Sequence, residues 1–190
     1  MSRGVLIVLA GTSGAGKGTL GRRLRDLDPD LRWSVSWTTR SARPGEQPGV
    51  DYHFKTPAEF ERLRDADGFL ESFEVYDDRY GTPRHFVEEA IAAGHDVLLE
   101  LDVQGALAVR DARPDALLVF VRAPSPEEQR RRLESRATDD AEAIERRLAR
   151  AAAEEEIARE RFDAVIVNDD VERAATELAA IVKARRSGER

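Results

Sequence analysis

Short apolar segments that alternate with helical patterns predict an α/β fold, with an open parallel sheet that carries helices on both faces. Three segments, residues 5–10, 96–101 and 116–121, have the length and apolar content of buried strands. Helix-start signals or leucines at helical spacing follow the first and the third. Because these connections contain helices rather than two-residue turns, the strands should pair in parallel within one sheet.

The composition excludes several classes of protein. The chain has 190 residues, no cysteine and a net charge of -7. This length supports one large core, with insertions. The lack of cysteine excludes disulfides and thiolate metal sites, and the negative charge argues against broad binding to nucleic acid or anionic membranes. No apolar run approaches a membrane span. We therefore expect a soluble, cytoplasmic protein, acting as a monomer or homodimer, that binds neither nucleic acid nor membrane.

The first predicted strand, residues 5–10, ends in a glycine-rich loop, GTSGAGK, and a helix is expected from about Lys17. Gly11, Gly14 and Gly16 allow the loop to curl so that its N–H groups point inward, and the helix adds its positive end. Such a cradle binds a polyphosphate, with the Lys17 ammonium within reach of the outer phosphates. The alternative is a strand-to-helix turn that binds nothing. The order strand, loop, lysine and helix favours the phosphate site.

The residue after Lys17 departs from the phosphate-loop pattern G-x-x-x-x-G-K-[S/T]. Gly18 stands at the hydroxyl position, and the hydroxyl comes one residue later, at Thr19. One residue turns a helix by about 100°, so Thr19 cannot point where a residue-18 hydroxyl would. We expect Thr19 to help hold the magnesium of a bound nucleotide, directly or through water.

The segments after the loop alternate between core elements and one irregular stretch. Leucines at helical spacing predict a helix over residues 18–27, and residues 33–37 read as a second strand. The stretch SVSWTTRSARPGEQPGVDYHF mixes prolines, glycines and arginines, which favours a functional loop, and residues 51–54 close it as a small strand.

Two capped helices and two strands predict an inserted unit. Thr56-Pro57-Ala58-Glu59 has the pattern of a capping box, and its helix should end near Gly68. Residues 69–76 and 79–81 read as strands, and Thr82-Pro83 reads as a second capped start for a helix that ends at Gly94. Residues 38–83 therefore read as an insertion into a core formed by residues 1–37 and 84–190.

The rest of the core carries acidic groups at a strand end. The strand at residues 96–101 contains Glu100 and precedes Asp102, and chemistry is expected at the carboxyl end of such a parallel strand. Further along, Ser125-Pro126-Glu127-Glu128 opens an arginine-rich helical region that extends to residue 161, with one break over residues 135–140. A last strand at 164–167, a turn at 168–170 and a helix at 171–186 complete the pattern.

Eight segments stand out along the chain: GTSGAGKGT, SVSWTTRSARPGE, GVDYHF, FLES, YGTP, LLELDVQGA, RRRLESR and VIVNDD. They fall in the order found in guanylate kinases, and the chain resembles that family over nearly its whole length. The resemblance implies a P-loop NTPase-type core, an inserted small α+β GMP-binding domain at residues 38–83 and a helical lid at about residues 135–148. Family members transfer the terminal phosphoryl group of ATP to GMP, giving ADP and GDP with Mg²⁺, and dGMP is expected as a second acceptor.

The resemblance assigns acceptor residues one at a time. Ser36 in SVSWTTR, Glu71 in FLES and Thr82 in YGTP match guanine-reading residues, and Asp102 matches an acidic position near the acceptor. Four residues match groups that hold the GMP phosphate: Arg40, Arg43, Tyr52 and Tyr80. Glu71 alone would be exposed in most proteins, so its role depends on the family. Ser36 could simply end a strand, Thr82 could cap the following helix, and the tyrosines could be packing residues.

The chemistry of this acceptor set agrees with the resemblance. Guanine presents a ring N–H and an exocyclic amine side by side, which one carboxylate accepts in parallel, whereas adenine offers a ring nitrogen acceptor there. Glu71 should therefore repel adenine. Two arginines suit a dianionic phosphate because each planar guanidinium binds a pair of oxygens.

The donor side follows the same resemblance. ATP is expected on the residues of the loop, which are Gly11, Thr12, Ser13, Gly14, Ala15, Gly16, Lys17, Gly18 and Thr19. Asn168 matches a residue near the adenine base, with a turn-forming role as its alternative. Arg136 and Arg147 match lid arginines that, with Lys17, neutralise the transferring phosphoryl group. Glu100 is a candidate magnesium ligand through water, or else only lines the strand end.

The chain departs from the family pattern at four positions. Thr12 replaces a usual proline, Gly18 a common serine, Trp37 a small or polar residue, and Ala137 a glycine after the first lid arginine. None of these changes removes a charged group. Ala137 is expected to stiffen the lid, and Trp37 to narrow the acceptor cleft.

Two other functions remain as alternatives. A related kinase could phosphorylate a sugar phosphate such as a ribose bisphosphate, but a sugar has no use for the guanine-reading set of Ser36, Glu71 and Thr82. A guanylate-kinase-like module could bind peptides, but such modules have degraded phosphate loops, and Gly11, Gly16 and Lys17 are intact here.

Overall fold

The computed structural model describes residues 4–43, 45–75, 77–135 and 141–188. Its strands are β1 (Leu6–Gly11), β2 (Arg32–Trp33), β3 (Trp37–Thr38), β4 (His53–Phe54), β5 (Phe69–Val75), β6 (Asp78–Pro83), β7 (Val97–Glu100), β8 (Leu117–Arg122) and β9 (Ala164–Val167). Its helices are α1 (Lys17–Leu27), α2 (Pro57–Asp65), α3 (Arg84–Ala92), α4 (Val103–Ala112), α5 (Pro126–Glu134), α6 (Ala141–Arg161) and α7 (Val171–Ser187).

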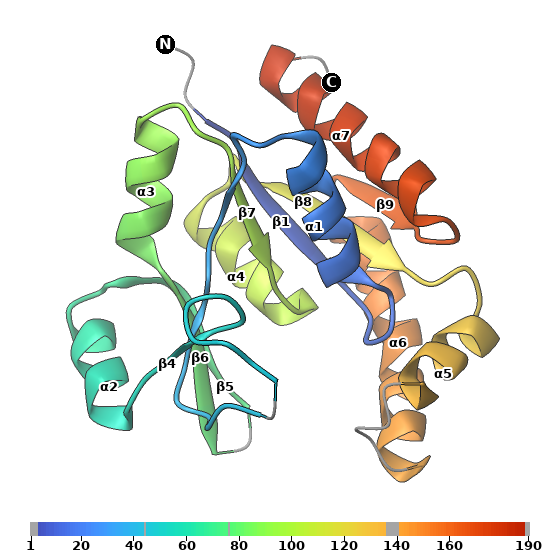
Figure 1. The fold of residues 1–190 in the computed structure, drawn as a ribbon, viewed down its shortest axis with the longest axis horizontal. Helices are drawn as coiled ribbons and strands as arrows, with labels where there is room; N and C mark the ends of the chain where they lie inside the picture. Colours follow the sequence, from blue (N-terminus) through green and yellow to red (C-terminus); the bar gives the residue numbers. More distant parts are fainter. Residues whose placement is uncertain (1–3, 44, 76, 136–140, 189–190) are drawn as a thin grey trace.

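The main sheet is parallel and has the strand order β2-β7-β1-β8-β9. Alternate residues of β1 point to opposite faces, so Ile7 and Leu9 pack with α1 and α7, while Leu6 and Val8 pack with α3 and α4 (Figure 1). The prediction of an open parallel sheet covered on both faces is confirmed. Among the described residues, no helix combines the length and the apolar content needed to cross a membrane.

A second sheet, of order β4-β3-β6-β5, lies beside the main sheet together with α2. The prediction of one strand over residues 33–37 is wrong, because this stretch divides between the two sheets. Trp33 pairs with Leu98 of β7, and the N–H of Ser34 donates to the Leu98 carbonyl at 3.0 Å. Trp37 instead pairs with Gly81 of β6. The residues between them carry the chain from one sheet to the other, which local pattern cannot reveal.

One of the two predicted caps in this unit forms and the other does not. Thr56 and Glu59 form the reciprocal capping box at the start of α2, as predicted. Thr82 does not cap a helix: Pro83 is the N-cap of α3, with no side-chain cap bond, and the Thr82 hydroxyl donates to Glu71 on the adjacent strand. A buried carboxylate acceptor thus takes the hydroxyl that the sequence assigned to the helix end.

The remaining elements follow the expected pattern, with one addition. Helix α4 was not among the expected elements, although Asp102 caps it by accepting the Gly105 N–H at 2.8 Å. Helix α5 ends at Glu134 with Ser135 as its C-cap, and α6 is described from Ala141. Apart from Ser135, the predicted break over residues 135–140 lies outside the described residues. Strand β9 has the predicted bounds.

Candidate active site

The loop between β1 and α1 forms a tight turn at the carboxyl end of the central strand (Figure 1). Gly16 precedes α1 in the left-handed region, with φ 87°. A Cβ atom there would lie 2.5 Å from Nδ2 of Asn168. Both the backbone angle and the close approach therefore require glycine at this position.

Side chains bind the loop carbonyls from several directions. Lys17 Nζ donates to the Gly11 carbonyl at 2.8 Å and lies 3.4 Å from the Thr12 carbonyl. Asn168 Nδ2 donates to the Ala15 carbonyl at 2.8 Å, and Gln129 Nε2 donates to the Ser13 carbonyl at 2.8 Å. Carbonyls held in this way leave the opposite edges of their peptide planes, which carry the N–H groups, available to a bound anion.

The structure places Asn168 beneath the loop. Its side chain is 2% exposed and its amide is bonded to Ala15, so this residue supports the phosphate loop directly. Arg132 of α5 joins the same contact: its Nη2 donates to the Asn168 carbonyl at 3.0 Å, and its Nε donates to Glu128 at 2.7 Å. Neither Gln129 nor Arg132 was predicted as a site residue. Their spacing of three residues beside buried Leu133 was the available signal that they share the inner face of α5.

The carboxyl end of β7 brings acidic groups to the loop. Glu100 pairs in register with Leu9 of β1, and its Oε2 would lie 3.2 Å from a Cβ atom at Gly18. The missing side chain at residue 18 thus leaves the space that Glu100 approaches. Thr19, on the first turn of α1, is exposed.

Within the described ranges, no group of three or more His, Asp or Glu residues could hold a metal ion by itself. Magnesium at nucleotide sites commonly uses one or two carboxylates together with substrate phosphates and water. The carboxylate of Glu100 beside the loop fits that mode of binding.

Glu71 of β5 is the central buried acid of the second sheet. It faces Thr82 across the β5–β6 ladder, and its Oε1 accepts the Thr82 hydroxyl at 2.6 Å. The residue is 6% exposed, and its Oε2 is buried without a hydrogen-bond partner. Burial raises the pKa of Glu71 to about 7, the Thr82 bond opposes this shift, and the charge of Asp102 adds to it. The carboxylate therefore has one oxygen fixed and one oxygen ready for a donor.

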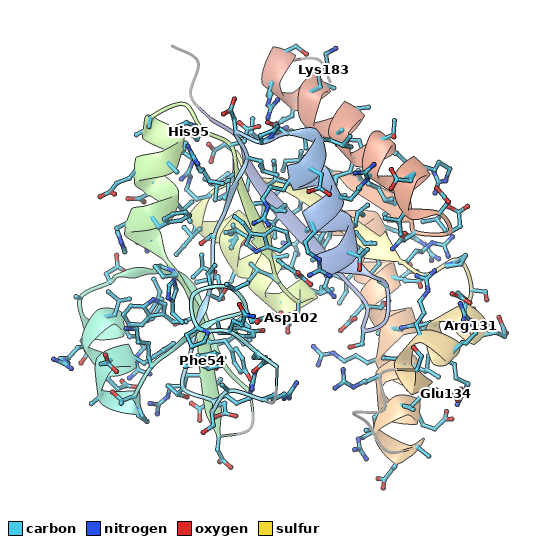
Figure 2. The ribbon with its side chains drawn as sticks, viewed as in Figure 1. Phe54, His95, Asp102, Arg131, Glu134 and Lys183 are labelled. Carbon is cyan, nitrogen blue, oxygen red and sulfur yellow. The ribbon has the colours of Figure 1, made fainter. Side chains whose placement is uncertain are left out.

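Asp102 lies between the second sheet and the helices α5 and α6. Figure 2 shows it at the N-terminal end of α4, with Phe54 on one side and Arg131 and Glu134 on the other. Its Oδ1 caps α4, and its Oδ2 lies 3.9 Å from Nη2 of Arg150 on α6. Asp102 therefore caps α4, raises the pKa of Glu71 through its charge, and lies near Arg150 of α6.

The predicted phosphate arginines occupy one loop but differ in their surroundings. Both terminal nitrogens of Arg40 donate to Glu46, at 2.8 and 3.0 Å, and the pKa of Arg40 is raised mainly by that bond. Glu46 Oε2 also accepts the backbone N–H of Arg43, at 2.7 Å. The side chain of Arg43 is exposed. Glu46 therefore fixes the guanidinium of Arg40 and the backbone that carries Arg43, a role the sequence analysis missed.

The two predicted tyrosines lie together beside Arg40. The rings of Tyr52 and Tyr80 meet edge to face, with centroids 5.9 Å apart, and Arg40 lies 5.5 Å from the Tyr52 ring centroid. Burial raises the pKa of Tyr52, and the neighbouring Tyr80 and Glu100 raise it further. Tyr52 therefore lies within electrostatic reach of Glu100 at the end of β7. Ser36 is half-buried in the link between the two sheets, where its carbonyl accepts the His53 N–H at 2.9 Å.

The predicted lid arginines are described in part. Arg136 and the neighbouring Ala137 lie outside the described residues. Arg147, on α6, donates from Nη1 to the Ser13 hydroxyl at 3.0 Å, so it reaches the phosphate loop.

Glu154 of α6 is a further acid that the sequence analysis did not select. Its Oε1 accepts Arg150 Nε at 2.8 Å, and its side chain is 13% exposed. Burial raises the pKa of Glu154, the charges of Arg150 and Lys17 oppose that shift, and Asp102 reinforces it. Glu154 therefore lies within electrostatic reach of both Lys17 in the loop and Asp102 at the start of α4.

Comparison with known proteins gives one consistent family. The family model described as guanylate kinase matches residues 3–185. A guanylate kinase of Rubrobacter xylanophilus is 54% identical over 183 residues, covering 96% of this chain and 95% of the relative. A guanylate kinase of Symbiobacterium thermophilum is 51% identical over 187 residues, covering 97% of this chain and 87% of the relative. The crystal structure of guanylate kinase from Anaplasma phagocytophilum superposes with a TM-score of 0.79 at 35% identity, covering 97% of this chain and 87% of that one.

The parallel sheet, the loop at the end of its central strand and these matches define a nucleoside monophosphate kinase with the P-loop fold. Such enzymes are transferases. The chain belongs to the guanylate kinase family.

Proposed function

We propose that the chain binds ATP on the loop at residues 11–19 and presents GMP to it from the second sheet. ATP-dependent phosphorylation of GMP is the activity that membership of the family gives the chain. The observation that carries the residue-level proposal is Glu71, whose Oε1 is bound by Thr82 and whose Oε2 is buried without a partner. A guanine N–H pair would satisfy that carboxylate, whereas adenine would not.

The acceptor domain in this proposal is residues 38–83, and the nucleotide-binding core is residues 1–37 and 84–190 with its lid at about 135–148. Ser36, Glu71, Thr82 and Asp102 surround guanine, and Arg40, Arg43, Tyr52 and Tyr80 hold the phosphate. The bidentate contact between Arg40 and Glu46 supports this assignment, because it fixes a guanidinium in place before the dianion arrives. The set reads base and phosphate, so dGMP is also an acceptor.

Catalysis in this proposal depends on alignment and on charge. Lys17 contacts loop carbonyls at the cradle, and Arg147 reaches Ser13, so both cations lie where the transferring phosphoryl group would pass. Arg136 supplies a second lid cation. The acceptor phosphate oxygen attacks the γ-phosphorus, the bond from that phosphorus to the β–γ bridging oxygen breaks, and ADP leaves with the oxygen, while these cations neutralise the charge on the transferring oxygens. Asn168 supports the loop beside the adenine.

Guanylate kinases generally use Mg²⁺ with ATP, and this chain has suitable groups for it. Glu100, through water, and Thr19 would hold the ion beside the phosphates. When bound, Mg²⁺ neutralises charge on the phosphate oxygens. The short approach of Glu100 to the Gly18 position supports this placement.

Release of ADP with GMP, dGMP, AMP and ribose phosphates as acceptors tests the proposal. We expect turnover with GMP and dGMP and little with the others. Lys17→Ala should lower kcat by about a hundredfold or more, the scale for loss of one group that stabilises transition-state charge. Lys183→Ala is the matched control, because Lys183 is exposed near the C-terminal end of α7, away from the loop (Figures 1 and 2). Equal use of AMP would refute the guanine pocket, and silence with every acceptor would favour a peptide-binding module.

A further inference from the structure

Gln129 is an unusual residue on α5 because its polar side chain is almost fully buried, at 4% exposed. Buried carboxamides are costly unless they are hydrogen-bonded. The partner of Gln129 is distant in sequence: its Nε2 donates to the Ser13 carbonyl, in the middle of the phosphate loop, at 2.8 Å. Loop and helix also touch beside this bond, since a Cβ atom at Gly14 would lie 3.2 Å from the Gln129 carbonyl oxygen.

The geometry of the peptide group gives this bond a consequence for nucleotide binding. The peptide between Ser13 and Gly14 is planar and trans, so its carbonyl and its N–H point in opposite directions. When Gln129 holds the Ser13 carbonyl toward α5, the Gly14 N–H is directed away from α5. Phosphate loops bind their ligand through such inward N–H groups.

The contact belongs to a wider attachment of α5 to the loop. Arg132 lies one helical turn beyond Gln129, and its Nη1 lies 3.5 Å from the Ala15 carbonyl. Arg147 of α6 binds the Ser13 hydroxyl at 3.0 Å. The helices before and after residues 135–140 therefore both contact Ser13, one at its carbonyl and the other at its side chain.

We infer that Gln129 is a positioning residue for the donor nucleotide: by fixing the Ser13 carbonyl it orients the loop N–H groups that receive the ATP phosphates. The inference rests on the proposed binding of ATP to this loop. It assigns Gln129 no contact with the nucleotide.

Gln129→Met tests the role by keeping the length of the side chain and removing the donor. The dissociation constant for a non-hydrolysable ATP analogue and the KM for ATP should both rise by about three- to tenfold, the range for one net hydrogen bond. The KM for GMP should change less than twofold. Arg131→Gln is the control on the same helix, because Arg131 points to solvent and pairs with Glu128 (Figure 2). It should leave both constants unchanged.

Gln129→Glu gives a readout that packing alone would not produce. Protonated glutamic acid can donate to the Ser13 carbonyl, whereas the carboxylate repels it. The ratio of variant to wild-type affinity for the ATP analogue should therefore approach one at low pH and worsen as pH rises. A ratio that does not vary with pH, or a Gln129→Met variant that loses thermal stability while keeping its ATP affinity, would overturn the inference. Wild-type turnover of GMP in the same experiment would leave the proposed function standing in that case.

Discussion

At the scale of single residues, burial decides the chemistry of Glu71. An exposed glutamate titrates near 4.5, but Glu71 is buried, and its pKa is raised to about 7. The Thr82 hydroxyl bond stabilises the carboxylate without overcoming the cost of burial. In the absence of nucleotide the group therefore changes its charge near neutral pH.

The affinity for GMP should consequently depend on pH. In the proposed acceptor pocket only the carboxylate form of Glu71 accepts both guanine donors, and with a pKa of about 7 the fraction in this form falls from about three-quarters at pH 7.5 to about one-tenth at pH 6. The dissociation constant for GMP, measured by calorimetry in the absence of ATP, should rise accordingly between pH 7.5 and 6. Because the GMP phosphate also titrates near this range, Glu71→Gln is measured in parallel. A wild-type profile that matches the variant's profile would contradict the raised pKa.

The same burial predicts that Glu71→Gln stabilises the free protein at high pH. The native pKa of about 7 lies above the ordinary glutamate value of 4.5, so between these values the native state binds more protons than the unfolded state. Wild-type stability attributable to this group therefore falls as pH rises through that window. The shift corresponds to about 3 kcal/mol when complete. In urea unfolding, the free energy of unfolding of the variant should exceed that of the wild type by up to this amount at pH 8. The difference should be less than half as large at pH 5.5.

Glu74→Gln provides the matched control for that experiment. Glu74 lies on the same strand, but its side chain is 59% exposed. Its substitution should change unfolding free energy by less than about 0.5 kcal/mol at either pH. A comparable gain from both variants would point to net charge instead of burial.

At the scale of elements, the phosphate loop is held as a unit by its neighbours. The loop follows the carboxyl end of the central strand β1, and α1 begins directly after it. Side chains from α5 and from the β9–α7 turn donate to its carbonyls. Glycine is needed where these neighbours approach most closely. Gly16 is the clearest position, because Asn168 would lie 2.5 Å from an added Cβ.

Gly16→Ala should therefore lower the free energy of unfolding by more than the strain of a left-handed alanine alone would. Gly188 has a similar positive φ of 74°, but a Cβ atom there meets nothing within 4 Å. Gly188→Ala measures the cost of a left-handed alanine, about 1–2 kcal/mol. Gly16→Ala should exceed it in urea unfolding and should also abolish binding of the ATP analogue. Equal destabilisation by the two variants, with ATP binding retained, would contradict the close packing of Asn168 on the loop.

At the scale of the whole molecule, contact between α4 and β5 positions the proposed acceptor side relative to the main sheet. Phe73 of β5 lies against Gly105, where an added Cβ would be 3.3 Å from its ring. Phe73 also stacks on Tyr80, with ring centroids 5.7 Å apart. A displacement of Phe73 would thus move both the strand that carries Glu71 and a predicted phosphate ligand.

Gly105→Val should consequently impair use of GMP more than use of ATP. Its branched side chain must push Phe73 away, so we expect KM for GMP to rise by about fivefold or more, while KM for ATP stays within about twofold; one misplaced contact of about 1 kcal/mol accounts for that change. Ala112→Val, at the exposed end of α4, controls for a β-branched residue in this helix. Equal changes in both KM values would indicate a general loss of folding.

The sequence by itself determined the features whose causes are local. The apolar run before GTSGAGK, the capping pattern at Thr56 and the end of α5 near residue 135 are each specified within a few residues. The order of motifs also predicted the family, which the comparisons confirm.

Only the tertiary structure decided the features that join distant segments. It divided residues 33–37 between two sheets, directed the Thr82 hydroxyl to Glu71 instead of a helix end, and brought Gln129 to Ser13. The physical reason is that burial and hydrogen-bond partners depend on which surfaces meet after folding. A residue's own neighbours in the chain specify its backbone, but its charge state and its contacts are set by segments that can lie more than a hundred residues away, as for Gln129 and Ser13.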